Sequence, residues 1–359
     1  MAKYKQYGYD IQNGKAIIPE WETEIKEEAF NGCKELTNVE FPLWIKKIGC
    51  RAFYGCENLT EITLPEWVEE IGEGAFCSCK NLKSITLPRW VKKIGEEAFC
   101  GCSSLTNISV SKDNKVYDSR EDCNAIIRTE SNTLISGCKN TIIPPSVTEI
   151  EDLAFYNCSS LTNIAIPPSV TKIGMGAFYS CSSLTNISIP PSMTEIGEYA
   201  FWGCSSLTSI SIPPSVTKIW WGAFWGCSSL TNISVSKDNK VYDSREDCNA
   251  IIHTESNTLI SGCKNTIIPP SVTKIGDSAY GGCSSLMSIS IPPSVTKIGE
   301  WAFDRCSSLT SISIPPSVTE IEDEAFRCCR SLTEVRIPKG CHVDKEAFIS
   351  CPNVQIIRY

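Results

Sequence analysis

Hydrophobic and polar positions follow one pattern that returns every 23 residues along most of the chain. The copy at residues 184–206 reads LTNISIPPSMTEIGEYAFWGCSS. Leu184, Ile187 and Ile189 alternate with polar residues, which predicts a short strand. The two prolines that follow should end this strand, because proline cannot donate the next ladder hydrogen bond. A second short extended piece should come next, and then a single helical or 3₁₀ turn that buries Phe201.

A fixed period of this length is typical of a solenoid, in which each repeat buries its apolar face only against its neighbours. Stacked copies would bring the strands of successive repeats together in parallel, about 4.8 Å apart. The phenylalanine of each copy would then fill the core of its own turn. We therefore predict one continuous domain over 1–359 rather than two separate domains.

Two longer segments interrupt the period, at 107–143 and 232–268. They belong to a near-identical duplication, in which 47 residues recur 125 positions later with a single difference, Arg128 against His253. In each insertion two β-rich runs flank a short polar turn. This arrangement predicts a hairpin.

Both ends of the chain carry signals of their own. Residues 1–18 place Gln12-Asn13-Gly14 between two short runs of strand-forming residues, a strong hairpin signal, and this hairpin should cap the first repeat. Residues 338–359 form the last repeat, in which 354–358 predicts a final strand with an unpaired edge. Weak end-to-end self-association is the behaviour we expect from such an edge.

Cysteine is used as a repeat position in this chain. Twelve of the 21 cysteines close successive copies of the pattern and should point into one core layer as buried reduced thiols, because free cysteine packs as a small hydrophobe. They stand at positions 33, 56, 79, 102, 158, 181, 204, 227, 283, 306, 329 and 351. Disulfides are the alternative at the hairpin bases, between Cys123 and Cys138 and between Cys248 and Cys263. We predict no metal site and no cofactor, because closely spaced cysteines should point in opposite directions.

Charge and hydropathy narrow the classes of partner. The net charge of −8 and the isoelectric point near 5.1 argue against nucleic acid or an anionic membrane as a partner. No apolar run is long enough to insert across a bilayer. The N-terminal segment lacks the apolar core of a signal peptide, so the residues alone leave the localisation open.

The sequence contains no recognisable set of catalytic residues. The chain has only two histidines, His253 and His342, and the first is arginine in the other copy of its segment. No nucleophile and base, phosphate-binding loop or unique carboxylate pair stands out from the repeat. We therefore predict that the protein is not an enzyme.

Because the copies are so similar, their differences indicate where recognition would be placed. The position before the second conserved isoleucine mostly alternates between glutamate and lysine, which favours a structural column of paired charges. The most variable positions follow Ile-Gly and Ala-Phe, and several hold large aromatics, which dominate interface energetics. The candidate ligand-binding residues are Tyr156, Tyr179, Tyr199, Trp202, Trp221 and Trp225. The other interpretation is that these rings stack on one another and cover the turn surface.

The consensus LTSISIPPSVTKIGxxAFxxCSS and the insertion KVYDSREDCNAIIRTESNTLISGCKNTIIPPSVTEI resemble the BspA-like leucine-rich repeats of the Treponema type, across essentially the whole chain. The resemblance implies a leucine-rich repeat solenoid, a curved right-handed stack of short parallel strands. It also implies adhesion or protein binding, usually on a bacterial surface or in mucosal protists, and hence a secreted or cell-surface location. The export signal of such surface proteins is not visible in this chain.

Residues and resemblance together predict a non-catalytic solenoid that recognises a protein or a glycan, such as one of a host, through the variable columns of its repeat. Its role would be adhesion or recognition at a microbial surface. Two alternatives stay open, a cytosolic protein-interaction scaffold and a self-associating structural repeat protein.

Overall fold

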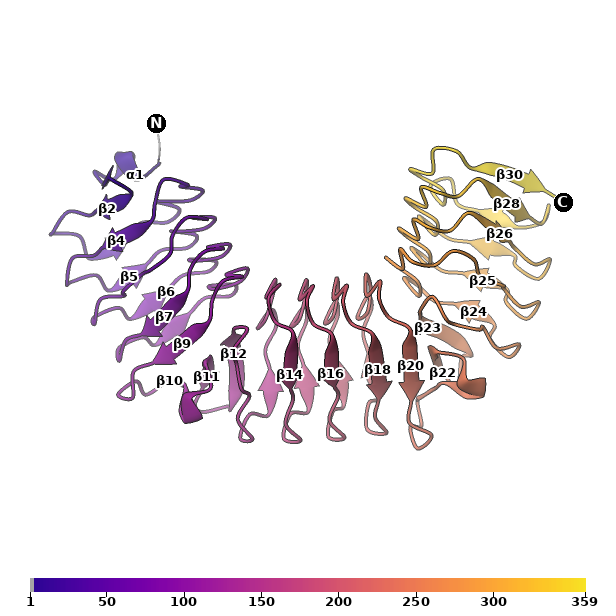
Figure 1. The fold of residues 1–359 in the computed structure, drawn as a ribbon, viewed down its shortest axis with the longest axis horizontal. Coiled ribbons are helices and arrows are strands. Elements are labelled where there is room, and N and C mark those ends of the chain that lie inside the picture. The colour runs from indigo at the N-terminus through magenta and orange to yellow at the C-terminus, as the bar shows by residue number, and fades with distance from the viewer. Residues whose placement is uncertain (1–2) are drawn as a thin grey trace. The chain divides into compact units, whose positions relative to one another are not determined.

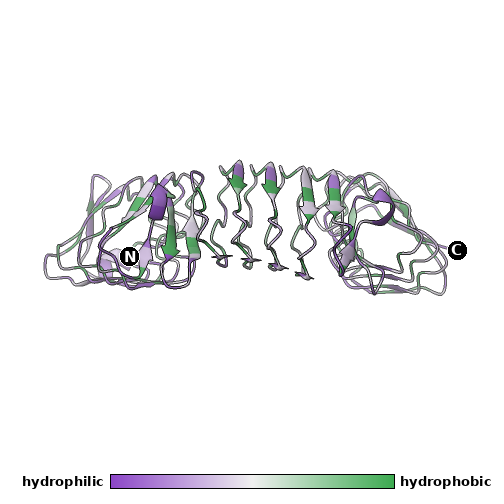
Figure 2. Ribbon diagram, turned by 90° about the horizontal axis from the view of Figure 1, so that it is seen from below, coloured by the Kyte–Doolittle hydropathy of each residue, from purple (hydrophilic) through white to green (hydrophobic). Residues whose placement is uncertain are grey.

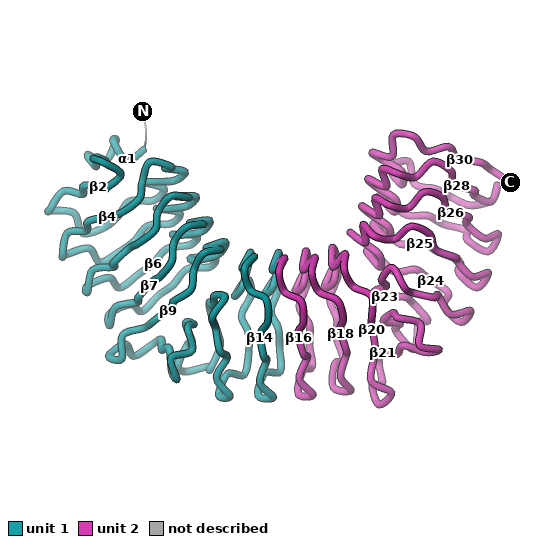
Figure 3. Tube along the Cα trace, viewed as in Figure 1, with its two compact units in different colours: residues 1–181 teal, residues 182–359 magenta. Residues whose placement is uncertain are grey.

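The structure is a computed structural model that describes residues 3–359, and its contacts divide the chain into two compact units (Figure 3). Unit 1 comprises residues 1–181 and unit 2 residues 182–359. Within each unit, short strands from successive turns stack side by side (Figure 1). Each unit is therefore a β-solenoid, and the predicted stack of 23-residue turns is confirmed. That the whole of 1–359 behaves as one domain stays a prediction.

Most regular turns contribute two very short strands, as the apolar pattern predicts. Buried and exposed residues alternate along the first strand, so hydrophobic and hydrophilic positions follow one another in Figure 2. The first strands are β4 (Asn38–Glu40), β7 (Ser84–Leu87), β9 (Asn107–Val110) and β14 (Asn163–Ala165) in unit 1, and β16 (Asn186–Ser188), β18 (Ser209–Ile212), β20 (Asn232–Val235), β26 (Ser311–Ser313), β28 (Glu334–Ile337) and β30 (Gln355–Arg358) in unit 2.

The second strands are only two residues long and form a separate column. They are β3 (Glu24–Ile25), β5 (Lys47–Ile48), β6 (Glu70–Ile71), β8 (Lys93–Ile94), β13 (Glu149–Ile150) and β15 (Lys172–Ile173) in unit 1, and β17 (Glu195–Ile196), β19 (Lys218–Ile219), β24 (Lys274–Ile275), β25 (Lys297–Ile298), β27 (Glu320–Ile321) and β29 (His342–Val343) in unit 2. Both columns pair in parallel with equivalent residues in register, as Ile210 with Ile233 and Ile25 with Ile48.

The segment that carries the phenylalanine, here called the plug turn, is not the helical or 3₁₀ turn expected from the sequence. Ala200 and Trp202 do donate backbone hydrogen bonds to the third residue before them. Tyr199, Phe201 and Gly203 donate instead to carbonyl oxygens of the next turn. Backbone hydrogen bonds within a turn thus alternate with hydrogen bonds to the next turn. The plug turns therefore form a third hydrogen-bonded column of the stack, beside the columns of first and second strands. The helical segments among residues 3–359 are α1 (Lys3–Gln6), η1 (Arg120–Asp122) and η2 (Arg245–Asp247), the last two being 3₁₀ helices.

The aromatic rings of the plug turns form the centre of each core, as predicted. Within a unit they stack on the ring of the next turn at centroid distances of 5.0–5.7 Å and interplanar angles of 2–7°. Phe303 is fully buried between Tyr280 and Phe326, at 5.0 Å from each ring. A ring inside a run of regular turns, such as Phe303, therefore buries its two faces against neighbouring turns rather than against its own.

Eleven of the twelve closing cysteines are buried beside these rings and Cys33 is half-buried, and most of their thiols have a partner that the sequence did not reveal. In most regular turns the thiol donates to the backbone carbonyl oxygen of the plug aromatic one turn earlier. The sulfur–oxygen distance is 3.1 Å for Cys56 and 3.2 Å for Cys227 and Cys306. The predicted buried position is confirmed, and the thiol also ties one turn to the one before it.

All 21 cysteines lie within the described residues and are free in this structure, so the alternative of hairpin-base disulfides is wrong here. The Cys123 thiol contacts the carbonyl oxygen of Ala125 at 3.8 Å, and the Cys138 thiol that of Asn124 at 3.4 Å. The copies at Cys248 and Cys263 make the same contacts. Each thiol is thus directed at a carbonyl of the hairpin strand rather than at its counterpart.

The insertions contain the predicted hairpins and one further strand each. The strands are β10 (Tyr117–Asp118), β11 (Ala125–Arg128) and β12 (Thr133–Gly137), and β21 (Tyr242–Asp243), β22 (Ala250–His253) and β23 (Thr258–Gly262). The last strand of each insertion pairs in parallel with the second strand of the following turn and so replaces a regular turn in the stack. It ends at Gly137 or Gly262, where a Cβ would collide with the ring of Phe155 or Tyr280. Glycine is needed there because the backbone itself covers the next plug.

The N-terminal hairpin is confirmed and closes the core of unit 1. Its strands are β1 (Asp10–Gln12) and β2 (Lys15–Ile17), which pair with each other antiparallel, and β2 continues in parallel to β4. Tyr4 and Tyr9 stack on the ring of Phe30 at 5.7 Å. The Tyr4 hydroxyl donates to Glu35, and this bond raises the pKa of Tyr4 to about 12. At the other end the predicted final strand is β30, paired in parallel with β28.

The charged column forms the ion pairs that its alternation predicts. Lys47 lies 3.7 Å from Glu24 and 3.9 Å from Glu70, and Lys93 lies 3.0 Å from Glu70. These groups are largely exposed, so each pair contributes only about 0–1 kcal/mol. Their role is to favour one register of the stack.

We expect Phe303→Ala to destabilise unit 2 by about 3–5 kcal/mol, because it removes a ring packed on both faces. Hydrogen exchange should quicken in the turns of Tyr280 and Phe326 as well as in the mutated turn. The control is Ser311→Ala, an exposed position on β26, which should leave exchange unchanged. Loosening confined to the mutated turn would contradict coupling through the stacked rings.

We expect a thiol reagent to label at most three cysteines quickly in the native protein and 21 after unfolding without reductant. Only Cys33, Cys50 and Cys328 are half-buried, while the others are buried. Burial also raises the pKa of the Cys56 thiol to about 12, which keeps the reactive thiolate scarce at pH 8. A count well below 21 in the unfolded protein would reveal disulfides and contradict this structure.

Candidate functional site

Four of the six candidate residues meet in unit 2. The ring of Tyr199 lies edge-on to Trp202 and Trp221, at centroid distances of 5.1 and 4.9 Å. Trp202 stacks face to face on Trp225 at 3.9 Å. All four side chains are half-buried. The rings therefore stack on one another, which is one of the two interpretations of the sequence. They also keep part of their area exposed to solvent, which the other interpretation, ligand binding, requires.

Trp301 completes this group, which we call the aromatic cluster: Tyr199, Trp202, Trp221, Trp225 and Trp301. Its ring centroid lies 5.0 Å from that of Trp221. Trp301 was not among the candidate residues, although the sequence held a signal for it. It occupies the same position of the repeat as Tyr199, the second residue after Ile-Gly.

The backbone at this repeat position is left-handed in most turns. Tyr199 has φ = 55° and Trp301 has φ = 53°, and the two equivalent residues between them, Gly222 and Ser278, have φ = 62° and 56°. Glycine adopts this conformation without strain, whereas a side chain costs about 1–2 kcal/mol. Charged and aliphatic side chains such as Glu97 and Leu153 stand at the same left-handed position in other turns, so this conformation is a property of the repeat rather than of the rings.

Charged residues border the cluster. The Arg305 guanidinium lies 5.5 Å from the ring centroid of Trp225, within range of a cation–π contact. Glu324 accepts hydrogen bonds from the indole of Trp301 at 2.6 Å and from Arg327 at 2.7 Å. This double contact fixes the orientation of the Trp301 ring.

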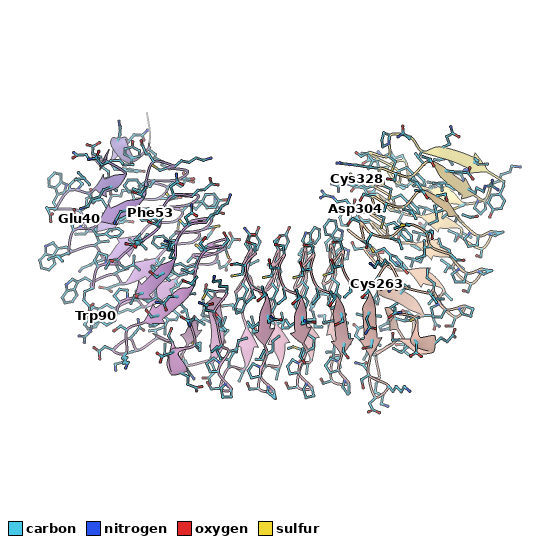
Figure 4. The ribbon with its side chains drawn as sticks, in the orientation of Figure 1. Glu40, Phe53, Trp90, Cys263, Asp304 and Cys328 are labelled. Atoms are coloured by element: carbon cyan, nitrogen blue, oxygen red, sulfur yellow. The ribbon has the colours of Figure 1, made fainter. Side chains whose placement is uncertain are left out.

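Asp304, labelled in Figure 4, is the buried acid of this region. Only 5% of it is exposed, and its Oδ1 has no hydrogen-bond partner among the described residues. Burial raises the pKa of this carboxyl to about 6, against the opposing charges of Arg327 and Arg305, whose nitrogens are 3.9 Å away. Asp304 is therefore a group whose charge changes under mildly acidic conditions.

The remaining two candidates, Tyr156 and Tyr179, lie in unit 1. Their rings stack at 5.0 Å with an interplanar angle of 16°, and both side chains are half-buried. Unit 1 also carries a more exposed tryptophan column, which the sequence places where other turns have serine. Its members are Trp21, Trp44, Trp67 and Trp90, with exposures of 80, 60, 45 and 38%. Trp67 and Trp90 stack on each other at 6.0 Å.

Residues 3–359 contain no group of three or more histidine, cysteine or acidic side chains that could hold a metal ion. None of the helices in this range has the length and apolar character that a membrane span requires.

The chain belongs to the BspA-type leucine-rich repeat family. The model of this family, described as the BspA type leucine rich repeat region in six copies, matches residues 9–123, 131–248 and 256–359. The predicted resemblance and fold class are thereby confirmed. Members of this family and fold are repeat proteins, and no curated protein matches the chain.

Solved structures share the fold at low sequence identity. A leucine-rich cell surface protein of Faecalibacterium prausnitzii is 24% identical, with a TM-score of 0.51, over 98% of this chain and 86% of that one. A leucine-rich repeat protein of Eubacterium ventriosum is 24% identical, with a TM-score of 0.55, over 85% and 80%. The pneumococcal vaccine antigen PcpA is 19% identical, with a TM-score of 0.55, over 94% and 71%. At these identities the likeness concerns the fold alone.

We expect the free energy of unfolding to fall as the pH rises from about 4 to about 6, by at most about 3 kcal/mol, through Asp304. The sign follows because the folded protein holds the Asp304 proton in this range while the unfolded chain has lost it. Asp304→Asn should flatten this part of the stability profile, measured by denaturant unfolding. The matched control is the exposed Asp238→Asn, which should keep the wild-type slope. An unchanged slope in Asp304→Asn would contradict the assignment.

Proposed function

We propose that this protein is a non-catalytic recognition or adhesion solenoid that binds a protein or glycan through the variable positions of its plug turns. The aromatic cluster of unit 2 is its principal contact surface, and Tyr156 and Tyr179 form a contact surface in unit 1. The proposal rests above all on one observation. The five rings of the aromatic cluster, which come from three plug turns, pack on one another while each keeps part of its area exposed to solvent.

The surroundings of the cluster support binding rather than catalysis. The nearby acids have structural partners, since Glu324 holds Trp301 and Arg327, and Asp304 lies between two arginines. A general acid or base instead needs a free route to a substrate proton. Half-buried tryptophan and tyrosine next to arginine are the residues that contribute most to binding at interfaces.

A location outside the cell suits this function best. The family match and a fold shared with a cell surface protein support this location. The threonines of the strands bond to the backbone of the preceding turn and vary little between turns, so we place recognition in the plug turns. A cytosolic scaffold would use the same surfaces for a protein partner. Self-association would require that the clusters bind copies of this chain.

We expect the double variant Trp202→Ser, Trp225→Ser to weaken binding to mucin-coated or fibronectin-coated surfaces by about 2 kcal/mol or more, the usual threshold of an interface hot spot. Biolayer interferometry measures the affinity, and a mucin sample stripped of its glycans separates protein from glycan binding. The matched control is Trp67→Ser, Trp90→Ser, which removes an equivalent stacked pair from unit 1.

Thermal unfolding must first show that both double variants fold. Loss of binding in the control pair alone would move the contact surface to the tryptophan column. Sedimentation across a hundredfold concentration range tests self-association. Concentration-dependent assembly that the Trp202 and Trp225 changes abolish, without binding to either surface, would replace recognition by self-assembly.

A further inference from the structure

The tryptophan column of unit 1 occupies the corner between the first and second strand positions of four consecutive turns. Each corner is a four-residue turn in which the last residue donates a backbone hydrogen bond to the first, as Val68 does to Pro65 at 3.2 Å. Tryptophan is the third residue of each corner, and Trp90 lies at the outer margin of unit 1 in Figure 4. The column is therefore a row of rings on the outside of the stack.

These four corners differ from the later ones at both of their central positions. The seven regular corners that begin between Pro144 and Pro315 all read Pro-Pro-Ser, and proline at the second position stiffens such a turn. In the first four corners the tryptophan is preceded by an exposed residue other than proline. These residues are Glu20, Leu43, Glu66 and Arg89. A rigid corner with a small side chain is thus replaced, four times in succession, by one that presents a large ring.

The column leaves a large apolar surface uncovered. The exposed fractions of its four rings correspond to roughly 550 Å², with about 250 Å² for a fully exposed tryptophan. Leu43, which precedes Trp44, is 71% exposed and adds to this surface. The largest apolar patch of a typical monomer measures about 300–600 Å² and is often functional. Together with the charged residues beside it, the column approaches the roughly 800 Å² that one partner contributes to a standard protein interface.

The two halves of the column differ in how their rings are packed. Trp67 and Trp90 stack on each other at 6.0 Å, and the Arg89 guanidinium lies 4.9 Å from the ring centroid of Trp90. Trp21 and Trp44 are the more exposed pair, at 80 and 60%, and no aromatic ring of residues 3–359 lies within stacking distance of them. One half of the column therefore has ring faces that are open, and the other half has rings that are already paired.

The charges beside the column change sign from turn to turn. When the order of the four turns is reversed, acidic and basic residues meet. The resulting pairs are Glu20 with Arg89, Glu24 with Lys93, and Lys47 with Glu70. A two-fold axis perpendicular to the stack makes this reversal, because it runs two copies of the column antiparallel. A two-fold axis along the stack would instead set each charge against its own copy, which repels.

Ion pairs between turns balance most of these charges within one copy. Arg89 lies 3.9 Å from Glu66, and Lys92 lies 2.9 Å from Glu69. The surface around the column is therefore nearly neutral, and it offers little attraction to anionic lipid headgroups or to a strongly charged protein. Its own reversed copy, in contrast, matches it in both apolar area and charge order.

We propose that the tryptophan column is the interface of a two-fold symmetric dimer, in which the columns of two copies of this chain pack antiparallel. The open rings of Trp21 and Trp44 in one copy meet the stacked Trp90 and Trp67 of the second copy. Glu20 meets Arg89 of the second copy at each end of the interface. This pairing uses residues of unit 1 and goes beyond the recognition proposed for the aromatic cluster of unit 2.

Sedimentation of the full chain across a hundredfold concentration range tests the pairing. The wild type should form a reversible dimer at micromolar concentration, as expected of an interface at the lower end of the standard size. The double variant Trp21→Ser, Trp44→Ser should raise the dissociation constant at least about tenfold, because tryptophans are common hot spots of interfaces. Serine stands at this corner position in later turns, so it suits the turn. The matched control is Ile142→Ser, which removes a side chain that is 72% exposed outside the column and should leave the dimer unchanged.

Charge reversal tests the antiparallel arrangement. Glu20→Arg and Arg89→Glu each set like charges against one another in the dimer and should raise the dissociation constant several-fold. The double variant that carries both changes should return it to about the wild-type value. Both residues are exposed, so the changes should have little effect on folding, which thermal unfolding checks. Single changes that weaken the dimer without recovery in the double variant would contradict the antiparallel arrangement.

Other outcomes would overturn the proposal outright. A wild type that stays monomeric, or a dimer that persists in Trp21→Ser, Trp44→Ser, excludes the column as the interface. A monomer that binds phosphatidylcholine vesicles or a proline-rich peptide, and loses this binding in the same variant, would assign the column to a lipid surface or to a peptide. A dimer that forms without binding to mucin or fibronectin would leave the pairing standing while the proposed recognition fails.

Discussion

The stacking of one plug ring on the next is the interaction on which the rest of this structure depends. A turn of 23 residues is too small to enclose a phenylalanine, so a ring within a run of regular turns uses the rings of the neighbouring turns as its walls. The stack tolerates a change of one residue in the length of a turn, since Phe326 and Phe348 are 22 residues apart and still stack at 5.0 Å. The thiol bonds to the plug carbonyls and the plug-turn backbone bonds follow from the same alignment.

The insertions show how the chain departs from this constraint without exposing its core. Each replaces a regular turn by a hairpin that has no ring, and a glycine at the end of its last strand lays backbone over the next plug. The core stays covered, but the column of plug turns loses a member. Each insertion therefore leaves a cavity between the plug turns that flank it, of about 200 Å³ in unit 2 and about 380 Å³ in unit 1, and the variable residues of these turns line it.

Recognition and stability are therefore divided between columns of the same repeat. The buried columns of leucine, isoleucine, phenylalanine and cysteine barely vary, since each side chain packs on its equivalent in the next turn. The positions after Ile-Gly and Ala-Phe face outward or along the column of plug turns, so they can change with little effect on the core. The aromatic cluster, Asp304 and the charged residues beside it all come from these positions.

The sequence by itself determined the parallel stack, the buried phenylalanines and cysteines, the hairpins and the family. Many similar copies of one repeat show which positions are always apolar, so the structure of a turn can be inferred even where a single copy is ambiguous. It also placed Tyr199, Trp202, Trp221 and Trp225 in the variable columns of the repeat. Only the tertiary structure decided that the plug turns bond between turns instead of forming helices, since that choice depends on acceptors supplied by the neighbouring turn. It likewise decided that Trp301 joins the cluster and that Trp225 and Ser278 line the same cavity. Both facts arise from the missing plug turn at the insertion, which brings together residues that a regular repeat would keep apart.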